Sequence, residues 1–294
     1  MNDYFLSVLL GIVEGLTEFL PVSSTAHLRI SEALLHIPLG DPYWKMYTIV
    51  IQLGAILALL LLFMKRIVDF IRSFPEGENG DRTRWNHPLT LTLMAFVCTA
   101  IPALLLTKII GKHLESIRVM ALSLLIGGVV MWAVDLWSSQ TYPSTKEVDE
   151  MSLWQAVWIG ICQVTSAVFP GTSRSMSTIA AGQVVGMTRS AALEFSFLVS
   201  IPTMIAATGY DLLRTLHPKH LEGSEAIAPL TMHLHGWIVL AIGFVVSFIV
   251  ALGVVEWFLQ WVRKHGFTLF AIYRILLGTA LLVYGSRLTD LASH

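Results

Sequence analysis

A short polar run, EGLTEFLPVSSTAH at residues 14–27, lies between two strongly apolar stretches of this 294-residue chain. Glu14 and Glu18 are four residues apart, so on a helix their carboxylates share one face. Like charges at that spacing repel each other, and they do so more strongly when they are removed from water. The pair therefore indicates a site with a compensating divalent cation, arginine or shared proton. The alternative is a solvated pair at a helix end.

Hydroxyl groups and a histidine follow the two carboxylates. Pro21 should end the first helix. Ser23, Ser24 and Thr25 can cap the next helix, whose free backbone N–H groups would bind an anion. His27 comes just inside that second helix and could act as a nucleophile or as a general acid or base near neutral pH. The simpler alternative for His27 is a hydrogen bond to a neighbouring carbonyl.

A second polar cluster, PGTSRS at residues 170–175, follows another apolar stretch. Arg174 offers a fork of N–H donors that suits a phosphate, and its place predicts a helix N-terminus, which also favours anions. Arg174 could instead pair with Glu14 or Glu18, and the two roles do not exclude each other. The two clusters together indicate phosphate chemistry.

The two clusters also resemble each other. GIVEGLTEFLPVSSTA (11–26) aligns with GICQVTSAVFPGTSRS (160–175) at a constant offset of 149 residues, and both contain the skeleton G-x-x-[EQ]-x6-P. An offset near half the chain length predicts an internal repeat. If three membrane-spanning helices separate the copies, the second copy is inverted, and inverted repeats with broken helices tend to form a site near the membrane midplane.

The composition is that of a polytopic membrane protein. Hydrophobic residues make up 55% of the chain and charged residues 13%, where soluble proteins carry about 25% charged residues. The mean hydropathy is +0.69. A net charge of −1 gives no indication of nucleic-acid binding. The two cysteines, Cys98 and Cys162, lie in apolar segments, which argues against a disulfide framework.

The pattern predicts an all-α polytopic membrane protein with six transmembrane helices, two re-entrant helix–loop–helix hairpins and an inverted repeat. The hairpins are expected at 4–28 and 151–188, where polar residues, proline or glycine interrupt the apolar sequence. We expect one membrane domain over 1–294, with a first repeat at 1–140 and a second, inverted repeat at 150–294. The six spans are predicted at 47–64, 89–107, 119–134, 195–210, 236–255 and 266–286.

Three polar residues lie in or directly beside the predicted spans, and one loop bears on the orientation. Glu194 and Gln52 could line the cavity between the hairpins, while Arg274 is interpreted as a helix-packing or interfacial residue. Lysine and arginine are almost evenly divided between the two sides of the membrane, but five of them lie in the 65–88 loop, and this favours a cytoplasmic loop with both termini on the other side.

The motifs EGLTEFLPVSSTAHL (14–28) and PGTSRSMSTI (170–179) resemble the two signature motifs of the bacterial undecaprenyl-diphosphate phosphatase family. The order, the spacing and the chain length match, and VIQLGAIL (50–57) and LEFSFLVSIP (193–202) are also similar. This chain has Ala26 and Met176 where the family pattern has glycine. The resemblance predicts that the bulky Met176 stands next to the phosphate loop.

The resemblance implies a bacterial inner-membrane enzyme that hydrolyses the lipid carrier undecaprenyl diphosphate to the monophosphate for cell-wall synthesis. It implies a site that opens to the periplasmic side and a divalent cation, Mg²⁺ or Ca²⁺, for which Glu14 and Glu18 are the candidate ligands. The implied partners are the polyprenyl diphosphate substrate and membrane lipid, with a homodimer as a further expectation. The functional residues carried over by motif are Glu14, Glu18, Ser23, Ser24, Thr25, His27, Ser173, Arg174, Ser175 and Thr178.

The sequence leaves the mechanism open between a His27 nucleophile, a serine nucleophile such as Ser24 with His27 as base, and direct attack by water. A second class of function shares the same predicted parts, because secondary transporters and lipid flippases also use inverted repeats, broken helices and midplane carboxylates. His27 and the hydroxyl-rich loops favour the enzyme, since a carboxylate-based ion coupler does not require them.

Overall fold

The computed structural model describes residues 2–38, 41–77, 80, 82–107, 116–216 and 233–292. Within these residues the regular structure is helical, with one isolated bridge between Thr145 and Met187. A short 3₁₀ helix, η1, covers Val148–Glu150. The α-helices are α1 (Asp3–Thr17), α2 (Ser24–Leu34), α3 (Pro42–Ser73), α4 (Pro88–Leu105), α6 (Ile117–Ser139), α7 (Leu153–Val168), α8 (Arg174–Val184), α9 (Arg189–Leu216), α10 (Leu234–His265) and α11 (Thr268–Ala292).

Six of these helices, α3, α4, α6, α9, α10 and α11, are long and apolar enough to cross a membrane. Each of them coincides with one predicted span, so the prediction of a multi-pass membrane protein is confirmed. Several helices are longer than their apolar segments, because residues that favour a helix start or a helix end lie outside those segments. The α3 helix, for example, starts at Pro42, and the Asp41 side chain caps it by accepting hydrogen bonds from the N–H groups of Tyr43 and Trp44.

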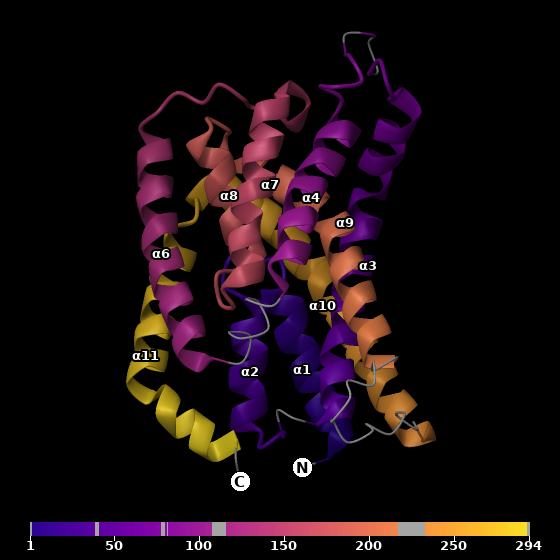
Figure 1. Cartoon of the computed structure of the whole chain (residues 1–294), viewed down its shortest axis with the longest axis vertical. Helices are drawn as coiled ribbons and strands as arrows, with labels where there is room; N and C mark the ends of the chain where they lie inside the picture. Colours follow the sequence, from indigo (N-terminus) through magenta and orange to yellow (C-terminus); the bar gives the residue numbers. More distant parts are fainter. Residues whose placement is uncertain are drawn as a thin grey trace.

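The four shorter helices form two helix–loop–helix units. Figure 1 shows α1 and α2 in the half of the molecule that holds both termini, and α7 and α8 in the other half. The α1 helix packs on α10, and α7 packs on α4. Glycines allow both contacts, since a Cβ atom on Gly11 would lie 2.8 Å from the carbonyl oxygen of Gly243, and one on Gly160 would lie 2.4 Å from that of Ala95.

A buried carboxylate ties four helices together in the half that holds α7 and α8. Asp135 of α6 is 1% exposed. It accepts hydrogen bonds from Arg189 Nε at 2.7 Å and from Gln183 Nε2 at 3.2 Å. It also accepts from the backbone N–H of Phe267 at 3.1 Å and the hydroxyl of Thr268 at 3.2 Å, just before and at the start of α11. A buried charge with this many donors fixes α6, α8, α9 and α11 relative to one another.

A second ion-pair group explains Glu194, which the sequence suggested as a cavity residue. Arg66 of α3 donates to Glu194 of α9 at 3.1 Å and also binds Asp149 of η1. Glu194 is absent from the lining of the pocket described below. Its carboxylate therefore serves to join α3 to α9 and η1, and the cavity role suggested from its position in an apolar span is wrong.

Candidate active site

Two loops that end in the same unusual backbone conformation bring the polar clusters together. The first, which follows α1, contains Pro21, and the second, which follows α7, contains Pro170. Each loop ends in a serine with a left-handed backbone, Ser23 at φ 74° and Ser173 at φ 71°. Each serine caps the helix that follows, because its hydroxyl oxygen accepts a hydrogen bond from the third residue on. A non-glycine residue in this conformation costs roughly 1–3 kcal/mol, so the surroundings must hold both loops in place.

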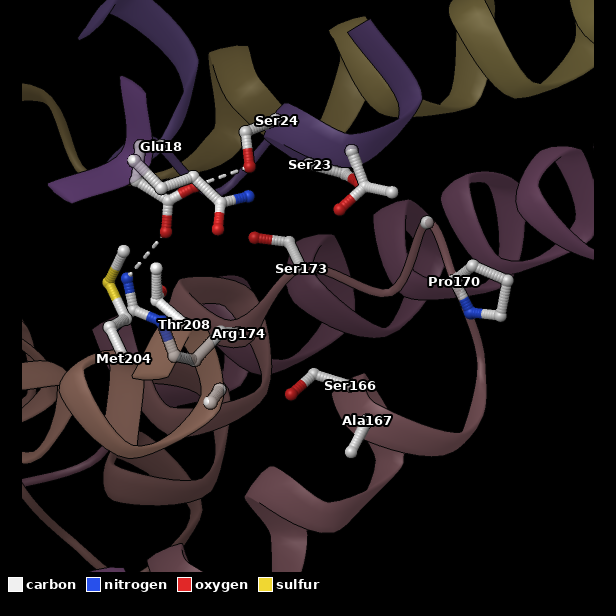
Figure 2. A pocket seen from close by; sticks show the side chains of 14 residues that line it. Glu18, Ser23, Ser24, Ser166, Ala167, Pro170, Ser173, Arg174, Met204 and Thr208 are labelled. Carbon is white, nitrogen blue, oxygen red and sulfur yellow. Dashed lines mark hydrogen bonds and ion pairs between the residues drawn. The ribbon is translucent and has the colours of Figure 1, made fainter. Parts of the chain in front are cut away.

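A pocket of about 190 Å³ lies between the two loops. Figure 2 shows Glu18 and Ser24 on one side of it and Arg174 on the other, joined through the Glu18 carboxylate. The pocket wall also includes small and apolar side chains from α7 and α9. The lining residues are Glu18, Ser23, Ser24, Thr25, Gln52, Ser166, Ala167, Pro170, Gly171, Ser173, Arg174, Met204, Ala207 and Thr208.

Glu18 is the centre of the polar contacts in this pocket. Its Oε2 accepts a short hydrogen bond of 2.5 Å from the hydroxyl of Ser24, and its Oε1 lies 3.2 Å from Nη2 of Arg174. The side chains of Arg174 and Glu18 are only 12% and 9% exposed. Nη1 of Arg174 is buried and has no hydrogen-bond partner. The site thus holds a hydroxyl bound to a carboxylate, beside a guanidinium with an unused donor.

His27 lies outside the pocket lining, and both nitrogens of its ring have partners. Nδ1 lies 2.7 Å from the carbonyl oxygen of Ser23, so this nitrogen must carry the proton. Nε2 lies 2.6 Å from the hydroxyl of Tyr273 in α11, against which the ring also stacks. These contacts attach the His27 ring to the first loop and to α11, and they include the hydrogen bond to a neighbouring carbonyl that was the simpler alternative for this residue.

Glu14 lies behind the pocket, one helical turn before Glu18. It is 0% exposed, and neither of its carboxylate oxygens has a hydrogen-bond partner. An ionised carboxylate without a partner is costly to bury, so Glu14 requires a proton or a nearby positive charge. Two carboxylates close to several hydroxyl groups are oxygen ligands of the type that Mg²⁺ and Ca²⁺ accept. The described residues contain no cluster of three or more His, Cys, Asp or Glu that could bind a metal by itself.

Ser175 and Thr178 stand behind Arg174 and away from the pocket. The Thr178 hydroxyl donates to the carbonyl oxygen of Arg174 at 3.0 Å or of Ser175 at 3.2 Å, and lies 2.6 Å from the hydroxyl of Ser196 in α9. The Ser175 hydroxyl lies 3.5 Å from the carbonyl oxygen of Glu18. These two residues join α8 to α9 and to the end of α1. Of the ten residues that the motifs suggested, the pocket brings together Glu18, Ser23, Ser24, Thr25, Ser173 and Arg174.

The structure refines two expectations about neighbouring residues. Met176 stands next to the second loop, since its N–H donates to the hydroxyl of Ser173, but its side chain is buried at 4% exposure and is absent from the pocket lining. Its methyl group lies 2.7 Å from where a Cβ atom on Gly127 would be, so the glycine in α6 leaves room for the extra side chain. Of the two alternatives for Arg274, the structure supports helix packing, because the side chain is fully buried and contacts α6 as well as both loops. Its charge inside an apolar span was the available signal, whereas its targets are backbone carbonyls that no sequence pattern marks.

Comparisons with known proteins identify the family of this chain. The sequence profile of the family described as bacitracin resistance protein BacA matches residues 7–280. The chain belongs to this family. A protein of Koribacter versatilis named undecaprenyl-diphosphatase is 64% identical over 284 residues, which are 97% of this chain and 99% of the relative. Proteins with the same name from Rhizobium etli and Thermus thermophilus are each 41% identical, over 95% and 92% of this chain and 96% and 93% of their own.

Proposed function

We propose that this BacA-family chain hydrolyses undecaprenyl diphosphate to undecaprenyl monophosphate and inorganic phosphate. The observation that carries the proposal is the contact of Glu18 with both Ser24 and Arg174 in one pocket. A carboxylate next to a hydroxyl is a base next to a nucleophile, and a guanidinium stabilises charge on a transferring phosphoryl group. The name shared by the relatives supplies the substrate.

The first step of the proposed reaction uses Ser24. Its oxygen attacks the terminal phosphorus, its proton passes to Glu18, and the bond from that phosphorus to the bridging oxygen breaks. The electron pair leaves on undecaprenyl monophosphate. The guanidinium of Arg174, which lines the pocket and has one donor, Nη1, without a partner, binds a phosphate oxygen during this step. Water then hydrolyses the phosphoserine and releases inorganic phosphate.

This assignment favours serine over His27 as the nucleophile. The ring of His27 is held by Ser23 and Tyr273 and lies outside the pocket, while the Ser24 hydroxyl points at Glu18 inside it. A histidine nucleophile would have to break its bond to Tyr273 and turn toward the pocket. Direct attack by water is the remaining alternative, with Glu18 as its base.

A divalent cation is a further part of the proposal. Glu14 and Glu18 would hold Mg²⁺ or Ca²⁺, with substrate phosphates as the other ligands, since Mg²⁺ sites commonly combine one or two carboxylates with phosphates. The partnerless oxygens of Glu14 support this role. When bound, such an ion neutralises charge on the phosphates.

We also infer that the α1–α2 and α7–α8 units are re-entrant hairpins of an inverted repeat. The serine caps, Ser23 and Ser173, share one unusual backbone conformation, and α1 packs on α10 as α7 packs on α4. The three long apolar helices α3, α4 and α6 separate the two units. The caps are 150 residues apart, one more than the offset of the sequence alignment, so Ser23, rather than Ser24, corresponds to Ser173.

The proposed location is the bacterial inner membrane, with the site open to the periplasmic side. Met204, Ala207 and Thr208 line the pocket and come from the second half of α9, which ends in the half of the molecule that holds both termini (Figure 1). The basic residues Lys65, Arg66, Arg72, Arg82 and Arg84 lie toward the opposite end, in α3 and shortly before α4, and favour the cytoplasm there. A cysteine placed at Tyr142, in the loop at the α7–α8 end, should react with a membrane-impermeant thiol reagent only after the cells are opened. Labelling in intact cells would contradict the orientation.

The activity is tested with purified protein in detergent and a C55 polyprenyl diphosphate, by measuring released phosphate. Wild type should release phosphate and the Ser24→Ala variant should not, while both keep the same thermal unfolding midpoint. A transporter or flippase would move the lipid in vesicles without releasing phosphate. Folded wild-type protein that releases none, with or without Mg²⁺ or Ca²⁺, would overturn the proposal.

A further inference from the structure

Arg274 lies within α11, outside both polar clusters, and is the largest of the fully buried side chains. Its Nη1 donates to the carbonyl oxygen of Pro21 at 3.1 Å. Its Nη2 lies 3.1 Å from the carbonyl oxygen of Gly171 and 2.9 Å from that of Thr172. The same nitrogen lies 3.1 Å from the carbonyl oxygen of Ser123 in α6. One guanidinium therefore binds the backbone of both loops at once.

The contacts of Arg274 with the loops lie close to the two serines that have a left-handed backbone. Pro21 precedes the left-handed Ser23 by two residues, and Thr172 comes directly before the left-handed Ser173. Backbone carbonyls in such loops lack the partners that a helix would give them, and a charged donor makes stronger hydrogen bonds than a neutral one. The four hydrogen bonds of Arg274 all go to backbone oxygens, so its role is to hold chain segments in place.

We propose that Arg274 is a positioning residue that sets the distance between the two loops, and with it the placement of Ser24 opposite Arg174. This inference rests on the proposed function, since it assigns to the two loops a diphosphate that spans them. A ligand with two phosphates needs both loops at the correct separation, whereas a single phosphate can be held by one loop. Arg274 thus contributes to the recognition of a diphosphate without touching it.

The test compares Arg274→Lys and Arg274→Gln with wild type. A lysine keeps the charge but cannot reach Pro21 and Thr172 together, because its donors share one nitrogen. We expect kcat on the C55 diphosphate to fall by about tenfold or more for lysine and further for glutamine, given the sensitivity of catalysis to small displacements. Arg189→Gln is the matched control, since it breaks the ion pair of a partly exposed arginine with the buried Asp135, away from the loops. It should lower the unfolding temperature but leave kcat within about twofold of wild type.

A binding measurement separates positioning from general destabilisation. The affinities for methylenediphosphonate and for inorganic phosphate are measured by isothermal titration for each variant. The Arg274 variants should lose diphosphonate affinity by about tenfold and phosphate affinity by much less, in line with the loss of one of two linked contacts. Arg189→Gln should leave the ratio of the two affinities unchanged. An Arg274→Lys variant with wild-type kcat and a wild-type affinity ratio would overturn the inference.

A second variant covers the case in which the Arg274 variants fail to fold. A Cβ atom on Gly127 would lie 2.3 Å from Nη2 of Arg274, so Gly127→Ala must displace the guanidinium without removing it. Gly253→Ala is its control, because no atom lies within 4 Å of the added Cβ. Gly127→Ala should lower the ratio of diphosphonate affinity to phosphate affinity, and Gly253→Ala should not. Equal ratios for the two variants would contradict the role of Arg274. If wild type binds diphosphonate but hydrolyses nothing, the proposed activity fails while the positioning role is still tested.

Discussion

The two loops end in the same backbone conformation and differ in chemistry. Both place a serine in the left-handed conformation. In both, the side chain four residues later donates a hydrogen bond to the carbonyl oxygen of that serine: His27 Nδ1 to Ser23 at 2.7 Å, and the Ser177 hydroxyl to Ser173 at 3.1 Å. The first loop adds a carboxylate and a reactive hydroxyl. The second adds Arg174 immediately after its cap.

Under the proposed inverted repeat and mechanism, the comparison shows how a duplicated hairpin can give an asymmetric catalyst. A phosphoryl transfer needs a nucleophile with a base on one side of the phosphorus and positive charge around the transferring group. In that proposal, two copies of one loop, facing each other, supply two anion-binding helix starts. Substitution then gives the base to one copy and the cation to the other. Ser177 stands at the position in the second loop that matches His27 in the first. Because both side chains bind the carbonyl oxygen of the cap serine, the match supports a structural role for both residues.

The largest expected effect comes from Ser24→Ala. Removal of a nucleophile should lower kcat by about a thousandfold or more, whereas Ser23→Ala removes only a helix cap and costs about 1 kcal/mol of stability. Quenched turnover of substrate labelled with ³²P in the terminal phosphate should leave an acid-stable, base-labile label on wild type. An acid-labile, base-stable label would point to His27 instead, and a fully active Ser24→Ala variant without any label would leave water as the nucleophile.

The second loop is tested by Arg174. We expect Arg174→Ala to lower kcat/KM by about a hundredfold or more, because a preorganised donor is worth roughly 3 kcal/mol in the transition state. Arg174→Lys should restore little, since an ammonium cannot bind Glu18 and a phosphate oxygen through two separate nitrogens. The measurement is steady-state phosphate release. Near-wild-type activity of the lysine variant would show that only charge matters in this loop.

The sequence predicted the parts of this site better than their arrangement. Apolar length located six spans, and the motifs located six pocket residues, because composition and spacing carry both signals. The sequence could not give the role of Arg274, whose partners are backbone oxygens, or the room that Gly127 provides for Met176. Both depend on the packing of α6 and α11 against the loops. The homodimer and the cation stay predictions.

A smaller effect is expected at Glu14, whose replacement also tests the comparison of the two loops. Gln163 stands at the matching place in α7, is 1% exposed, and donates to the hydroxyl of Thr203 at 3.0 Å. An amide is therefore accommodated there, and Glu14→Gln should lower kcat/KM by only about tenfold, well below the loss for Glu18→Gln, which removes the base. Both variants are assayed over a range of Mg²⁺ and Ca²⁺ concentrations. Equal losses for the two variants would refute the division of roles between them.

The smallest effect is expected at His87, which lies far from both loops. Its replacement should change the stability of the protein and leave the activity unchanged. His87 is 1% exposed and caps α4, with Nδ1 accepting a hydrogen bond from the N–H of Leu89 at 3.2 Å and Nε2 lying 3.1 Å from the Ser73 hydroxyl. Burial, and then the positive charge of Arg82, lower the pKa of His87. The folded protein thus binds this proton less readily than the unfolded chain. The resulting stability is complete above the unfolded pKa of about 6.5 and is lost as the pH falls through the lower, folded value.

The variant His87→Asn tests that prediction, because asparagine caps a helix well and does not titrate in this range. From pH 7.5 to 5.0 the unfolding temperature in detergent should fall by about 2–4 °C more for wild type than for His87→Asn, the shift that about 1 kcal/mol gives in a large domain. At pH 7.5 the two proteins should have the same kcat and the same ratio of diphosphonate to phosphate affinity. Parallel pH curves would show that protonation of His87 does not disturb the cap. A changed affinity ratio would mean that the two loops are coupled to the opposite end of the molecule, and that their spacing is not set by the contacts around Arg274 alone.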